Sequence, residues 1–133
     1  MYIRKMLTVA MCLTFPLALT ANEPGKLREI DVKGIKIVLE KGKIDMPKVI
    51  KSAEELAKAI PDSDAIKKQV DFTKDDLVLF AWSGSGGDKI SARFDAMDKK
   101  TTFTYSLGLT RDLRRHVHLF AIPKFDFTIE KSK

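Results

Sequence analysis

The chain has 133 residues, of which 24 are basic and 18 acidic, and its formal net charge is +6 at pH 7. This balance is ordinary for a small protein and does not by itself indicate nucleic-acid binding. The single cysteine, Cys12, precedes the expected mature domain, which therefore has no disulfide, no thiolate zinc site and no thiol nucleophile.

The N-terminal segment has the layout of a bacterial-type secretory signal. Arg4 and Lys5 form a basic start, Met6–Leu19 is almost wholly apolar, and Ala21 is a small residue before a polar stretch. The apolar run is shorter than the roughly 20 residues that a membrane-spanning helix needs. We therefore expect residues 1–21 to be a signal peptide and the protein to be secreted or periplasmic. An uncleaved N-terminal anchor is the alternative.

The segment after the signal has two parts. Residues 22–29 are polar, contain Pro24 and Gly25 and show no periodicity, which predicts a flexible tether. Residues 30–133 suit a single domain with one core. Its first expected element is a strand over residues 35–40, where apolar and other side chains alternate after a break at Gly34.

Two short helices are expected next. Ser52 and Glu55 have the spacing of a capping box, in which each side chain accepts a backbone N–H at the helix start. Apolar residues on one face predict a helix that Pro61 ends. A second helix is expected over residues 63–70.

From Leu77 onward the pattern predicts strands. Residues 77–82 are apolar on both faces, as in a central strand. Residues 83–88 are rich in glycine and predict a hairpin connection. Further strands are expected over residues 90–96, 103–109, 116–122 and 125–129. The order predicts an α+β fold: an antiparallel sheet of about five strands with one or two short helices on one face.

Several short motifs resemble the C-terminal domain of PrcB-type protease-complex subunits. They are Val70–Lys74, the apolar strand that follows, the pair Gly86-Gly87, and Ile122–Lys124 at a strand end. The chain departs from the family at Asp88, where an aromatic residue is usual. Residues 108–116 also resemble a segment of small secreted bacterial proteins of unknown function. The resemblance implies an exported accessory or interaction domain rather than an enzyme.

The glycine-rich segment does not match a nucleotide or nucleophile motif. A P-loop needs Gly-Lys-Ser/Thr opening a helix, but Asp88 follows the glycine pair and a strand is expected next. A nucleophile elbow needs glycine two residues before Ser85, where Ser83 stands. The segment remains a candidate contact for a peptide or small molecule, formed by Trp82, Ser85, Gly86, Gly87 and Asp88. Trp82 is more readily explained as a core residue than as a partner-binding anchor.

A second candidate segment lies further along the chain and is rich in basic residues. It contains Arg111, Arg114, Arg115, His116 and His118. Arginine pairs with carboxylates and phosphates through two parallel hydrogen bonds, so an anionic partner is one interpretation. The other is a solvated loop with internal ion pairs to Asp112. The two histidines share one face of a strand and would begin a metal site only with a further ligand, Asp88 or Asp112.

These features favour an exported, non-catalytic binding or accessory domain without a cofactor or metal. Its expected partner is a protein or an anionic polymer of the envelope, and not nucleic acid, because no stacking aromatics lie between the arginines. The alternative is a small hydrolase or lyase that uses His116 or His118 as a base with a nearby aspartate. A purely structural envelope protein is the third possibility.

Overall fold

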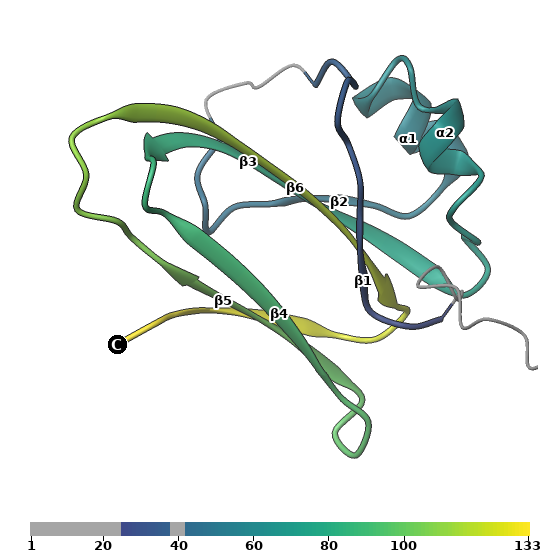
Figure 1. Cartoon of the computed structure of the whole chain (residues 1–133). Helices are drawn as coiled ribbons and strands as arrows, with labels where there is room; N and C mark the ends of the chain where they lie inside the picture. Colours follow the sequence, from purple (N-terminus) through teal and green to yellow (C-terminus); the bar gives the residue numbers. More distant parts are fainter. Residues whose placement is uncertain (1–24, 38–41) are drawn as a thin grey trace, which may run out of the picture.

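The computed structural model describes residues 25–37 and 42–133 (Figure 1). The expected signal peptide and residues 22–24 of the expected tether lie outside these residues. Within them, seven strands form two sheets and two short helices lie beside the larger sheet. The fold is therefore richer in sheet than the α+β arrangement expected from the sequence.

The larger sheet has the strand order β1-β6-β3-β2, and all its neighbours are antiparallel. The smaller sheet has the order β4-β5-β7, in which β7 runs parallel to β5. The strands are β1 (Arg28–Ile30), β2 (Lys48–Ile50), β3 (Asp75–Ser85), β4 (Lys89–Asp95), β5 (Lys100–Ser106), β6 (Leu113–Pro123) and β7 (Phe127–Lys131). The helices are α1 (Ala53–Ala59) and α2 (Asp64–Lys67).

Strand β3 holds the three layers together, because both of its faces are buried. Leu77 and Leu79 lie in a core shared with Leu56 of α1 and Ile66 of α2. The alternate residues of β3 lie in a second core, shared with Phe103 of β5. The prediction of a central strand at this position is thus confirmed, and its apolar character on both faces has a direct cause: helices cover one side and a second sheet covers the other.

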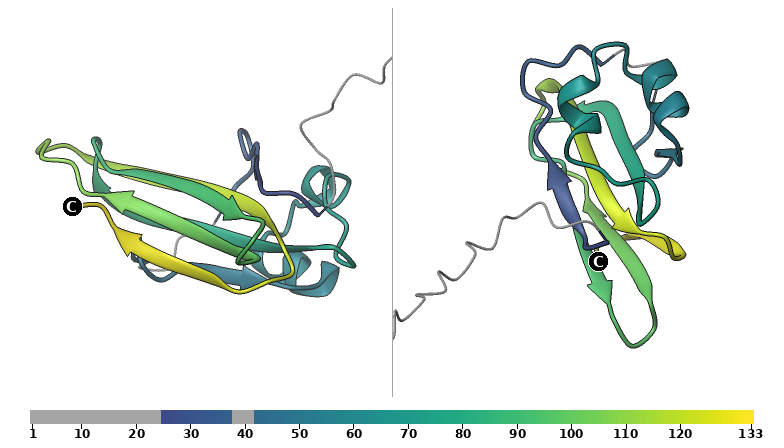
Figure 2. Two further views of the ribbon diagram at one scale, coloured as in Figure 1. Left: turned by 90° about the horizontal axis from the view of Figure 1, so that it is seen from below. Right: turned by 90° about the vertical axis from the view of Figure 1, so that its right-hand side faces the viewer.

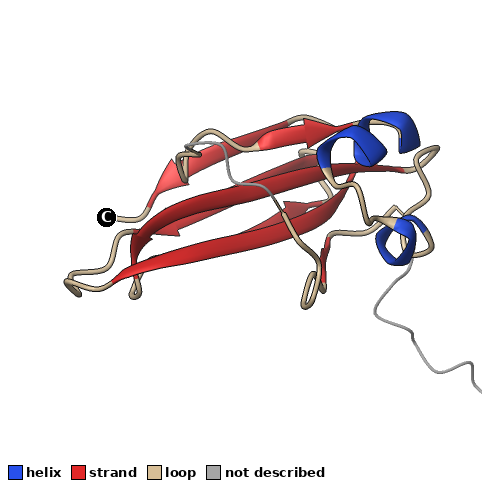
Figure 3. Ribbon diagram, turned by 90° about the horizontal axis from the view of Figure 1, so that it is seen from above, coloured by secondary structure: helices blue, strands red, loops and turns tan. Residues whose placement is uncertain are grey.

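The start of α1 follows the expected capping geometry. The Glu55 backbone N–H donates to the Ser52 hydroxyl at 3.2 Å, and the Glu55 carboxylate accepts the Lys51 N–H at 2.8 Å. Helix α2 is shorter than expected and ends at Lys67. Figure 3 shows both helices toward one end of the strands, with the C-terminus toward the other.

Three expectations about the sheet were wrong. The glycine-rich segment is not a hairpin: β3 extends to Ser85 and pairs with β6, whereas β4 pairs with β5, so residues 86–88 connect the two sheets. Of the strand expected over residues 35–40, residues 35–37 belong to no strand, and residues 38–40 lie outside the described residues. β1 begins at Arg28, inside the segment expected as tether, because the buried Arg28 side chain pairs with Asp75.

Candidate interaction surface

Two loops meet at the end of the sandwich that lies away from the helices (Figure 2). The first is the sheet-to-sheet connection over residues 86–88. The second is the β5–β6 loop over residues 107–112. They are adjacent because β3 and β6 pair to their ends, with Gly84 opposite Arg114 and Ser85 opposite Leu113. The structure thus brings together the two candidate segments identified in the sequence, and we call this region the loop end.

Hydrogen bonds between the two loops hold the loop end in shape. The hydroxyls of Ser85 and Thr110 lie 2.5 Å apart, and Gly86 N–H donates to the Asp112 carboxylate at 3.2 Å. The Thr110 hydroxyl, the Gly86 N–H and the Arg114 guanidinium all stabilise the charged carboxylate, and the pKa of Asp112 is lowered to about 2. Asp112 is therefore charged at neutral pH and able to accept these bonds.

Trp82 and Asp88 form the inner part of the loop end. Trp82 is buried, and its indole N–H donates to Asp88 at 3.0 Å. The other carboxylate oxygen of Asp88 accepts the Gly108 N–H at 2.8 Å. Trp82 is thus a core residue, as its sequence context favoured, and Asp88 joins both loops to it.

The glycines of this region allow a close backbone approach rather than unusual dihedral angles. A Cβ atom on Gly108 would overlap the backbone of Gly87, and one on Gly86 would overlap Asp112. Neither Gly86 nor Gly87 has a positive φ. Their absence of side chains lets the two loops touch.

Exposed side chains cover the outside of the loop end. Arg111, Arg114 and Arg115 are all exposed. Arg114 pairs with Asp112 at 2.6 Å, and Arg115 donates to the Ile37 carbonyl at 3.3 Å. Three leucines are also exposed: Leu107 by 51%, Leu109 by 99% and Leu113 by 80%. The strand expected over residues 103–109 was wrong at its end, because β5 stops at Ser106 and leaves Leu107 and Leu109 in the loop.

The histidines lie on one face of β6, as expected, and the face is the one that meets the small sheet. His116 stacks on Trp82, with 4.8 Å between ring centroids, and its Nε2 donates to the Ser85 carbonyl at 2.7 Å. The His118 ring also stacks on Trp82, with 5.7 Å between the ring centroids. His118 Nδ1 is 2.7 Å from the Glu29 carboxylate of β1.

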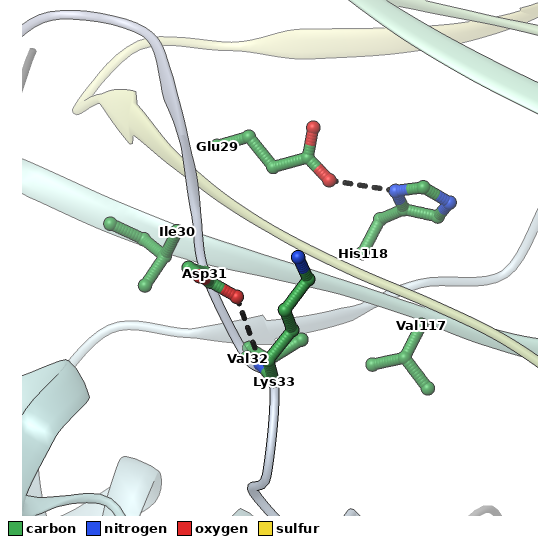
Figure 4. A pocket seen from close by; sticks show the side chains of 7 residues that line it. All are labelled: Glu29, Ile30, Asp31, Val32, Lys33, Val117 and His118. Carbon is green, nitrogen blue, oxygen red and sulfur yellow. Dashed lines mark hydrogen bonds and ion pairs between the residues drawn. The ribbon is translucent and has the colours of Figure 1, made fainter.

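A shallow pocket of about 450 Å³ opens beside this histidine (Figure 4). Glu29 and His118 line it together with Val117 and residues 30–33. Asp88 and Asp112, the expected further metal ligands, accept other hydrogen bonds. Asp88 accepts the Trp82 indole N–H, and Asp112 accepts the Gly86 backbone N–H. In residues 25–37 and 42–133, no three metal-ligating side chains are grouped closely enough to hold an ion.

Comparison with protein-family models, curated proteins and solved structures found no match. The resemblance to PrcB-type subunits therefore stays a prediction. Within the part of the chain that the structure describes, no helix has the length and apolar character needed to cross a membrane.

Proposed function

We propose that the chain is an exported binding module without catalysis of its own, and that it engages an anionic partner through the loop end. The partner is an acidic protein surface or an anionic component of the envelope. The observation that supports this most directly is the set of exposed arginines at the loop end, Arg111 in the β5–β6 loop and Arg114 and Arg115 at the start of β6, beside loops braced by hydrogen bonds.

The charges at the loop end favour an anion. Asp88 is buried against Trp82, and the exposed Asp112 accepts the Gly86 N–H and pairs with Arg114. The outward surface is left predominantly cationic. Arginine binds carboxylates and phosphates with two parallel hydrogen bonds, and a loop that is already ordered loses little entropy when it binds.

Replacing two arginines tests this proposal. We expect Arg111→Gln/Arg115→Gln to weaken binding of polyphosphate about tenfold or more, because each lost hydrogen bond to a charged group contributes about 1.5–3 kcal/mol. Isothermal titration calorimetry at low and high salt measures the change. Lys58→Gln/Lys67→Gln makes the same charge change on the helices and serves as the control. Equal loss in both variants, or no binding by the unaltered protein, contradicts the proposal.

One observation favours a second candidate, a small hydrolase or lyase. His118 is within hydrogen-bonding distance of a carboxylate and lines a pocket, which is the arrangement that a general base needs. The carboxylate is Glu29 of β1, not the aspartate that the sequence analysis expected. This candidate ranks second because the pocket is shallow and open.

An activity screen with chromogenic esters separates the two candidates. If His118 is a base, we expect turnover that His118→Gln abolishes and His116→Gln retains, since His116 donates to the Ser85 carbonyl instead of a carboxylate. Turnover that survives His118→Gln, or no turnover with any ester, rules out this second candidate.

A further inference from the structure

We propose that the loop end docks on an anionic lipid bilayer, with Leu107, Leu109 and Leu113 entering the interfacial region. This inference rests on the proposed function and names its partner. It depends on three features of the loop end: the exposed leucines, the cationic residues around them, and the bonds that keep the loops in place.

The leucines are the first feature. Leu107 and Leu109 flank Gly108, whose backbone touches Gly87, and Leu113 lies opposite Ser85 in the β3–β6 pairing. The backbones of all three therefore lie in one small region, and Leu109 is almost wholly exposed. Exposed apolar side chains that occur together usually mark a surface that binds something apolar.

The second feature is the set of cations around the leucines. Besides the three arginines, exposed Lys89 lies opposite Ser106 in β4 and exposed Lys131 lies opposite Tyr105 in β7. The Ser132 N–H donates to the Tyr105 carbonyl at 2.7 Å, which keeps the end of β7 beside the base of the loop. Apolar side chains with cations around them match the profile of an anionic membrane, whose charged headgroups surround an apolar interior.

Together these features suit a bilayer better than a protein partner. A stable protein interface uses about 20–30 residues on each side, and leucine is under-represented among the residues that dominate its energy. The loop end offers only three exposed leucines, two in the β5–β6 loop and one at the start of β6, which is far fewer residues than such an interface uses. Membrane anchoring, in contrast, works when one modest apolar insertion is combined with basic residues, each signal being too weak alone.

The third feature is the rigidity of the loops. The bonds from Asp88 to Gly108 and from Asp112 to Gly86 hold the two loops against each other. These bonds fix the backbone on both sides of Leu109. In Figure 2 this end of the sandwich lies away from the helices, so that the helices do not block its approach to a surface.

Vesicle co-sedimentation tests the inference with the purified protein. We expect binding to vesicles that mix phosphatidylglycerol with phosphatidylcholine and little binding to phosphatidylcholine alone. We expect Leu109→Ser/Leu113→Ser to weaken the binding about tenfold or more, because each leucine gains free energy on leaving water. Met97→Ser is the matched control, since Met97 is 94% exposed in the β4–β5 turn at the opposite end of β4. Unchanged thermal melting of all variants shows that folding is intact.

Quenching by lipids with brominated acyl chains reports insertion directly. We expect bound Leu109→Trp to be quenched more strongly than bound protein with only the buried Trp82, and Met97→Trp to show no such increase. Equal quenching in all three overturns the inference.

The other outcomes separate this inference from the proposed function. Binding of polyphosphate without binding of vesicles overturns the membrane inference and leaves the proposed function in place. Vesicle binding that is unaffected by the leucine substitutions shows attraction by charge alone and overturns insertion. Leucine-dependent binding of an acidic protein without vesicle binding also overturns it. Binding of neither probe contradicts both proposals.

Discussion

Asp75→Ala is expected to lower the free energy of unfolding by about 3–5 kcal/mol, the range found when one partner of a buried ion pair is removed. Asp75 is fully buried at the start of β3. Its carboxylate pairs with Arg28 at 2.9 Å and accepts the backbone N–H of Gly25 at 2.7 Å and of Asp71 at 3.2 Å. Removing it takes this ion pair from the buried Arg28 guanidinium and breaks the side-chain link between β1 and β3.

Chemical denaturation with urea measures this effect. Asp62→Ala is the control, because Asp62 is exposed in the α1–α2 connection, and we expect it to change stability by about 0.5 kcal/mol or less. The double variant Arg28→Met/Asp75→Leu is expected to recover most of the loss, since buried ion pairs can be replaced by apolar side chains of similar volume. A loss below about 1 kcal/mol for Asp75→Ala would show that the pair does not hold β1 in place.

Phe103→Ala is the second large effect, with an expected loss of about 3–5 kcal/mol for a fully buried aromatic side chain. Phe103 is the residue of β5 that packs the small sheet on the large one. Its ring lies 4.8 Å from Phe80 of β3, 5.3 Å from Phe120 of β6 and 5.7 Å from Phe127 of β7. Truncation opens a cavity between the two sheets that the surrounding rings fill only in part.

The matched control is Phe125→Ala. Phe125 is 46% exposed, and its ring stacks on Phe94 at 6.2 Å outside the core. We expect this variant to lose about 1 kcal/mol or less, by the same urea titration. Similar losses in the two variants would contradict the assignment of Phe103 as the main contact between the sheets.

Local features of the chain were predictable because their causes are local. The capping residues Ser52 and Glu55 lie within one turn of the helix that they start, and their bonds form as expected. The apolar residues at 77–82 indicated a strand buried on both faces, and β3 is that strand. The shared face of His116 and His118 followed from the two-residue period of a strand.

The division into two sheets was not predictable from these patterns. Alternation shows which side of a strand is buried, but not which strand lies beside it. The glycines after β3 indicated a turn, and the structure uses this turn to pass from one sheet to the other. The leucines of the loop end were missed for the same reason, because only the folded chain shows that nothing in its described residues covers them.

The amino-acid sequence by itself determined where α1 starts, which strand is central, and that glycines and arginines gather in and beside two loops. Only the tertiary structure decided that these loops touch, that Glu29 meets His118, and that Asp75 holds Arg28 across a separation of 47 residues. The physical reason is range: capping and side-chain alternation act over a few residues, whereas strand order and the pairing of buried charges depend on how distant segments pack together.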